Sequence, residues 1–168
     1  PSNQCYCNST ALVASLTDIG NVSIGTLNNG VASPATNNSN ATNTYSNFTG
    51  VPAPTLELGT VLPITVTQIS LSGFTSSFIA AFIDFNQNGV FDTLTESFPL
   101  GLTTAPLGGN IKTAYIAIPS NAVLGLTRMR IVLKSNGSQS LTPCGTYTSG
   151  ETEDYTVIID NTTSLPPD

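Results

Sequence analysis

The side chains best suited to chemistry lie in one polar stretch near the middle of the chain. Oxygen-bearing side chains stand at every second position, a glycine follows the third of them, and two carboxylates come later: Asp84, Asn86, Asn88, Asp92 and Glu96. Calcium takes about six to eight oxygen ligands and needs a sharply turning backbone. With the backbone carbonyl of Val90 as a further ligand, this spacing predicts a calcium loop.

The same stretch has a second interpretation, a polar hairpin with Asn88-Gly89 at its tip. The helical calcium hand ends with glutamate at its twelfth position, but here Thr95 holds that position and Glu96 follows it. A calcium loop would therefore connect two strands rather than two helices.

A second acidic cluster lies near the C-terminal end, with three carboxylates in four residues: Glu151, Glu153 and Asp154. Such like charges repel one another unless a cation or an arginine neutralises them. They are candidates to complete the metal site, or to pair with Arg128 or Arg130. A hydrolase with paired carboxylates is the enzymatic interpretation. Because the chain has no histidine to activate a nucleophile, we predict no catalytic activity.

The composition excludes several classes of protein. Only 8% of the 168 residues are charged, against about 25% in an ordinary soluble domain. The net charge of −6 argues against nucleic-acid binding, which requires clustered lysine and arginine. No apolar run approaches the roughly 18 residues of a membrane-spanning helix. The low lysine content and the cysteines near both ends favour an extracellular protein whose export signal has been removed.

Three cysteines allow at most one internal disulfide. Cys5 and Cys7 are poorly placed to bridge each other, so we favour Cys7–Cys144. Cys5 is then either a free thiol or an intermolecular link. Possible glycan acceptors in Asn-x-Ser/Thr sequons are Asn8, Asn21, Asn37, Asn40, Asn47, Asn136 and Asn161.

Short β-branched and aromatic runs separated by turn residues predict an all-β fold without significant helix. We expect a sandwich of two antiparallel sheets, immunoglobulin-like or jelly-roll-like. One domain would cover residues 1–160, with an exposed Asn/Ser/Thr-rich loop at 30–50 and a linker or extended arm at 161–168. The predicted strands are 21–27, 55–58, 62–70, 78–85, 98–103, 111–118, 127–134 and 154–160.

Several motifs resemble the GEVED domain, a β-sandwich module of secreted and surface proteins, chiefly from Bacteroidota. The motifs occur in the family's order at 82–89, 118–119, 127–130, 143–147 and 150–157. In the name-giving motif Thr152 replaces valine, and Asn88 replaces the usual aspartate of the loop. The resemblance implies a non-catalytic module of the kind found beside proteases, adhesins and repeat-rich surface proteins.

We therefore expect a calcium-stabilised extracellular module with a structural or adhesive role, either a self-associating fibre subunit or a tandem repeat of a longer adhesin. The neutral Thr/Ser/Asn-rich composition and the spare cysteine motivate this expectation. The alternative is a glycan- or surface-binding accessory domain of a larger secreted enzyme, which would need an exposed aromatic platform.

Overall fold

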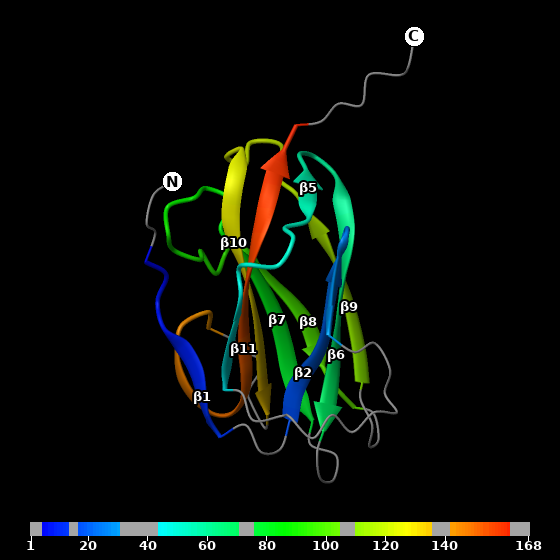
Figure 1. Cartoon of the computed structure of the whole chain (residues 1–168), viewed down its shortest axis with the longest axis vertical. Coiled ribbons are helices and arrows are strands. Elements are labelled where there is room, and N and C mark those ends of the chain that lie inside the picture. Colours follow the sequence, from blue (N-terminus) through cyan, green and yellow to red (C-terminus); the bar gives the residue numbers. More distant parts are fainter. Residues whose placement is uncertain are drawn as a thin grey trace.

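The computed structural model describes residues 5–13, 17–30, 44–70, 76–104, 110–135 and 142–161. Within these ranges the chain forms eleven strands and no helix, arranged as two facing sheets (Figure 1). The predicted all-β sandwich is confirmed. No helix in the described ranges is long and apolar enough to cross a membrane. The sequons at Asn37, Asn40 and Asn136 and the tail residues 162–168 lie outside the described residues.

The larger sheet has the order β1-β11-β10-β7-β8, and β4 and β5 also pair with β11. Strand β11 is the longest and forms an antiparallel ladder with β10 over ten residue pairs. Its pairings with β1, β4 and β5 are parallel, so this sheet is mixed rather than purely antiparallel. The strand bounds are β1 Ser9–Val13, β4 Tyr45–Phe48, β5 Thr55–Glu57, β7 Ser77–Ile83, β8 Ser97–Leu102, β10 Gly125–Ser135 and β11 Gly145–Asp160.

The smaller sheet has the order β3-β2-β6-β9, and all its pairings are antiparallel. A register shift interrupts the β2–β6 ladder between Ile19 and Asn21. The strand bounds are β2 Thr17–Ile24, β3 Leu27–Gly30, β6 Val61–Ser70 and β9 Asn110–Ala117.

The main core lies between the sheets and follows the two-residue alternation of strands. On β10, Met129, Ile131 and Leu133 are fully buried in this core, while Arg128 and Arg130 alternate with them on the outer face. A smaller apolar cluster covers that outer face. It consists of Ala80, Phe82, Phe91 and Val132, with Tyr6 and Tyr147 packed against it.

Strands β1, β3 and β4 were not predicted, and β4 lies inside the stretch expected to be a loop. Each is only four or five residues long, so these strands carry little periodic signal. Two of them instead form because β11 offers free backbone groups along one edge: β1 pairs from Ser9 to Gly145 onward, and β4 from Tyr45 to Thr152 onward.

Candidate polar loop and arginine–aspartate pocket

The polar loop connects the ends of two neighbouring antiparallel strands. Asp84 follows directly after β7, and Glu96 directly precedes β8, so the pairing of these strands brings the two carboxylates to one end of the sheet. Both are buried, with Asp84 fully inaccessible and Glu96 2% exposed. The backbone N–H of Asp84 also donates to the carbonyl of Arg128 at 3.1 Å, which fixes the start of the loop against β10.

Asp84 organises the turn by accepting backbone hydrogen bonds from the loop itself. Asn88 N donates to its Oδ1 at 3.2 Å, and Gly89 N donates to its Oδ2 at 2.9 Å. Gln87 and Gly89 adopt positive φ angles of 54° and 84°, as the tight turn requires. The loop therefore folds back around the Asp84 carboxylate.

Three further side chains in the loop accept from the backbone N–H two residues ahead. These bonds are Asn88 N to Asn86 Oδ1 at 3.0 Å, Val90 N to Asn88 Oδ1 at 2.8 Å and Leu94 N to Asp92 Oδ1 at 2.8 Å. Such local bonds stabilise turns and hold the side-chain oxygens close to the main chain. The Val90 and Asp92 side chains are themselves exposed.

Glu96 closes the loop from its other end. Its Oε1 accepts from the backbone N–H groups of Phe85 and Asn86 at 2.8 and 3.1 Å, and its Oε2 accepts from Asp92 N at 2.9 Å. Asp84 and Glu96 together satisfy backbone donors across the whole turn, so the loop is ordered by its own carboxylates.

The donor set of this loop consists of oxygen atoms, the ligands that calcium prefers. The described ranges contain two ion pairs, and both are formed by Asp154 on β11 with an arginine of β10. Within these ranges no lysine or arginine forms an ion pair with Asp84, Asp92 or Glu96. Those ranges contain no group of three or more acidic, cysteine or histidine side chains placed to hold a metal. A calcium ion here would therefore rely on the amide oxygens of Asn86 and Asn88 and on the Val90 carbonyl, besides the carboxylates.

The second acidic cluster does not join this loop, which corrects one of the alternatives from the sequence. Side chains alternate along β11, so Glu151 and Glu153 share the face of the core residue Tyr155, and Asp154 points to the other face. Glu151 accepts from Ile19 N at 2.9 Å and from Ser46 Oγ at 2.6 Å. It thus ties β2 and β4 to β11.

Glu153 is buried beside other acidic groups. Tyr155 donates its hydroxyl to Glu153 Oε2 at 2.7 Å. Burial, opposed by the Tyr155 hydrogen bond and assisted by the nearby Asp18 carboxylate, raises the pKa of the Glu153 carboxyl to about 8. Burial likewise raises the pKa of Asp18 to about 7. These carboxyls are part of the interior of the sandwich.

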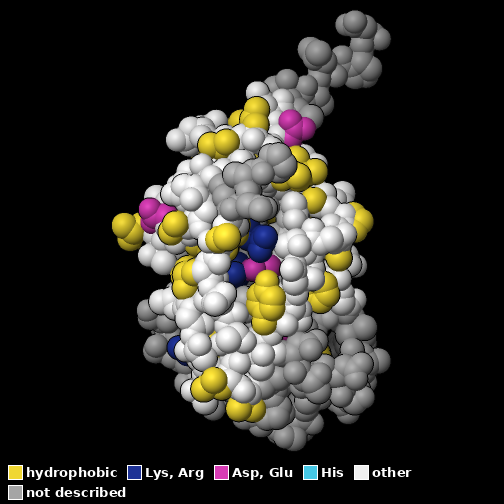
Figure 2. All heavy atoms as spheres, turned by 60° about the vertical axis from the view of Figure 1, so that its left-hand side comes forward, with side chains coloured by type: hydrophobic (Ala, Val, Ile, Leu, Met, Phe, Trp, Pro, Cys, Tyr) yellow, Lys and Arg dark blue, Asp and Glu magenta, His cyan; other side chains and the backbone are white. Residues whose placement is uncertain are grey.

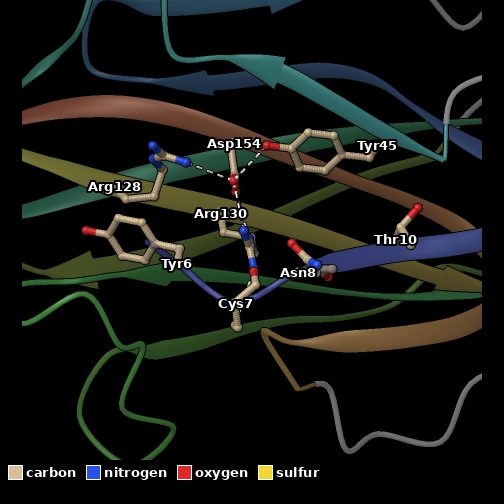
Figure 3. Close-up of a pocket in the computed structure, with 9 residues that line it drawn as sticks. Tyr6, Cys7, Asn8, Thr10, Tyr45, Arg128, Arg130 and Asp154 are labelled. Atoms are coloured by element: carbon tan, nitrogen blue, oxygen red, sulfur yellow. Dashed lines mark hydrogen bonds and ion pairs between the residues drawn. The ribbon is translucent and has the colours of Figure 1, made fainter. Parts of the chain in front are cut away.

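Asp154 forms a buried ion-pair network on the outer face of the larger sheet (Figure 3). Arg130 lies directly opposite Asp154 in the β10–β11 ladder and donates through Nε and Nη2 at 2.7 and 2.8 Å. Arg128 donates through Nη1 at 3.0 Å, and the Tyr45 hydroxyl donates at 3.0 Å. Asp154 therefore pairs with Arg128 and Arg130, as one of the two alternatives from the sequence stated.

This network forms the floor of a pocket of about 380 Å³. The N-terminal segment supplies one wall, through Tyr6, Cys7 and the neutral side chains that follow, and Tyr45 of β4 supplies another. Figure 2 shows the basic and acidic atoms together at the centre of a surface that is otherwise mostly neutral. The guanidinium of Arg128 lies over the Tyr6 ring, 4.9 Å from its centroid.

The sequence signals found the arginines and Asp154 but missed the two tyrosines of this pocket. Tyr6 belongs to a segment for which no strand was predicted, and Tyr45 lies in the stretch expected to be a loop. Both reach the pocket through contacts between residues far apart in the chain, and no local pattern reports such contacts.

The disulfide joins Cys7 to Cys144, the pair that the sequence analysis favoured, and Cys5 is free and exposed. This disulfide fixes the N-terminal segment next to the start of β11. Among the sequons, Asn8, Asn47 and Asn161 are exposed. Asn21 is only 4% exposed and donates its amide to Asn28 Oδ1, so this sequon is inaccessible in the folded chain. Asn21 is therefore withdrawn as a glycan site.

The described strands define a β-sandwich module with one ordered polar loop and one buried arginine–aspartate network. A GEVED domain model matches residues 78–158, which contain both features. This part of the chain belongs to the GEVED domain family, as the motifs predicted.

The structure gives each residue of the name-giving motif a role. Gly150 has a φ of +131°, and a Cβ there would overlap the carbonyl oxygen of Leu133 on β10. Glu151 joins two neighbouring strands, and the Thr152 hydroxyl lies within hydrogen-bond distance of the hydroxyls of Ser9 and Tyr147. Glu153 accepts from Tyr155, and Asp154 forms ion pairs with both arginines. The motif is therefore accounted for by packing and hydrogen bonding within the sandwich.

No curated protein matches the sequence. Among solved structures, the chain is similar to a Niemann-Pick type C2 protein from the Japanese carpenter ant, with 7% identity, a TM-score of 0.46, and coverage of 89% of this chain and 96% of that one. It is also similar to part of a family 123 glycoside hydrolase from Clostridium perfringens, with 14% identity, a TM-score of 0.45, and coverage of 83% and 27%. Similarity at this level carries no implication for function.

Proposed function

We propose that this chain is a non-catalytic, calcium-stabilised extracellular module that serves as a subunit or tandem repeat of a surface fibre or adhesin. The observation that carries the calcium assignment is the organisation of the polar loop. Its side-chain oxygens are held in place by backbone hydrogen bonds, and its three carboxylates have no basic partner within the described residues.

Calcium would act on stability rather than on chemistry. An ion that binds only the folded state stabilises it by about 2.7 kcal/mol when its free concentration is about 100 times Kd. Asparagine at two loop positions lowers the ligand charge, which favours moderate affinity and suits the millimolar calcium outside cells. The loop would then stiffen one end of the larger sheet.

The self-association part of the proposal is supported by the composition and by the exposed thiol of Cys5. The first test is the molar mass of the chain by light scattering, in millimolar calcium and in chelator, with and without a reducing agent. We expect large, length-dispersed species in calcium. A monomer under every condition would contradict the role of a fibre subunit. The remaining role would then be that of one domain in a longer protein.

A glycan- or surface-binding accessory role is the second candidate. The observation that favours it is the pocket above Asp154, which combines an exposed tyrosine ring with basic and neutral polar side chains. Binding and self-association are separable by experiment, because the first is measured on the monomer and the second by molar mass.

A further inference from the structure

We propose that the pocket above Asp154 binds a carboxylate-bearing sugar, such as a uronic acid unit of an extracellular polysaccharide. This inference specifies the ligand of the second candidate function and therefore rests on it. It does not require calcium in the polar loop, because the loop carboxylates do not line the pocket.

The charge in the pocket favours an anion. Two guanidinium groups, those of Arg128 and Arg130, share the single carboxylate of Asp154. The network therefore keeps a surplus of one positive charge, in a chain whose net charge is −6 and which has only four basic residues. Asp154 is only 1% exposed, and both of its carboxylate oxygens already accept hydrogen bonds from these arginines.

Arg128 is the residue that carries the surplus into the pocket. The Arg130 guanidinium is occupied on all sides, by Asp154 and by the carbonyls of Cys7 and Pro143 at 2.9 and 2.7 Å. Arg128 donates only through Nη1 to Asp154 among the described residues, and its side chain remains 25% exposed. Stacking on Tyr6 fixes the plane of its guanidinium. A planar guanidinium with unused N–H groups matches a carboxylate through paired hydrogen bonds.

The remaining walls favour a sugar over an acidic peptide. Asn8 is exposed, Thr10 and Tyr45 carry hydroxyls, and all three line the cavity without bringing charge to it. These groups match a ligand with several hydroxyls. The Tyr45 side chain is also 39% exposed, so its ring offers an apolar face to a pyranose. A cavity of about 380 Å³ lies at the small end of the range for ligand sites, which suits about one or two sugar rings.

The test measures binding of a galacturonic acid trisaccharide to the intact chain by calorimetric titration in chelator, with its carboxyl-methylated form as the neutral probe. The central variant is Arg128→Gln, and Lys112→Gln on β9 is the control because it removes the same charge from the opposite sheet. Tyr45→Ala tests the stacking face. A peptide of several aspartates serves as the non-sugar probe for carboxylates.

We expect the acidic trisaccharide to bind the native chain at least about tenfold more tightly than its methylated form, because the lost interaction is a charge-assisted hydrogen bond. Arg128→Gln should weaken binding of the acid to about the level of the neutral probe, and Lys112→Gln should change it less than about twofold. Binding of the aspartate peptide in place of the trisaccharide would overturn the sugar assignment. Equal affinity for both trisaccharides, or none at millimolar concentration, would overturn the site.

The comparison of the two trisaccharides uses the native protein, so it decides the question even if a variant fails to fold. A monomeric chain that binds the acid would support this inference while contradicting the fibre role. A polymerising chain without affinity for the acid would do the reverse.

Discussion

The Tyr6 hydroxyl donates a 2.8 Å hydrogen bond to Oδ2 of Asp84, across 78 residues of sequence. Burial and the hydrogen bond to the Asp84 carboxylate together raise the pKa of the Tyr6 hydroxyl to about 12, so Tyr6 stays a donor at physiological pH. The same ring stacks under Arg128 and packs near Phe91, 5.0 Å between centroids. One side chain thus contacts both the polar loop and the pocket, and the disulfide at Cys7 holds it there.

The calcium assignment is best tested with Asp92→Asn. The amide can still accept the bond from Leu94 N, so only the charge and one strong ligand are lost. We expect calcium to raise the melting temperature of the native chain and to raise that of the variant much less, with equal melting temperatures in chelator. Asp160→Asn is the matched control, since Asp160 also accepts a hydrogen bond from a nearby backbone N–H, that of Asn161, away from the loop. An unchanged calcium response in Asp92→Asn would contradict the assignment.

Asp84 is a poorer test residue, because its carboxylate holds the turn and Tyr6 as well. Asp84→Ala should therefore destabilise the fold in chelator too.

The buried pair of Arg130 and Asp154 should make a large difference to stability. Arg130→Met leaves Asp154 without its two-bond partner and also leaves the carbonyls of Cys7 and Pro143 unpaired. Breaking a buried pair in this way typically costs about 3–5 kcal/mol, measured as the free energy of unfolding in urea. Lys134→Met on the same strand is the control and should cost less than about 0.5 kcal/mol. Similar losses for the two variants would show that the network contributes little.

Glu153 should make the fold less stable as the pH rises. Its pKa in the folded chain is about 8, against an ordinary value of 4.5. Between these values the folded state holds a proton that the unfolded state has released, so the free energy of unfolding falls with pH across that window. Below pH 4.5 the stabilisation is fully present, and above about pH 8 it is lost.

We expect Glu153→Gln to reduce this dependence, with the part due to the raised pKa of Asp18 remaining, and to stabilise the chain at pH 8 by on the order of 1–3 kcal/mol. The glutamine carbonyl can still accept from Tyr155. Urea midpoints at several pH values measure the effect, with Glu57→Gln on β5 as the control. A native-like slope in Glu153→Gln would assign the pH dependence to another group.

Gly150 is required by backbone packing. Any side chain there would meet the carbonyl of Leu133 and would also need an unfavourable positive φ. Gly150→Ala should cost about 2–4 kcal/mol in the free energy of unfolding. Gly50→Ala is the control, because a Cβ added at Gly50 would have no heavy atom within 4 Å and the φ of this residue is not positive. Equal effects of the two substitutions would contradict the close approach of β10 and β11.

The order of residues alone is enough to specify the all-β class, most of the long strands and the polar turn. These features depend on residues close in the sequence: alternation places Met129, Ile131 and Leu133 on one face, and every side-chain to backbone bond within the loop joins residues no more than eleven positions apart. Local patterns of this kind can be read directly from the chain, as can the motifs shared with the GEVED family.

The remaining features depend on the complete fold. The parallel pairing of β1, β4 and β5 with β11 depends on which edge of β11 is left free. The three neighbouring carboxylates of the GEVED motif divide between two faces, where Ile19, Tyr155 and the arginines receive them. The pocket joins Tyr6 and Tyr45 to Asp154, which lies more than 100 positions from either of them. Such contacts form because folding brings distant segments together to bury apolar surface and satisfy polar groups, and no short stretch of sequence encodes them.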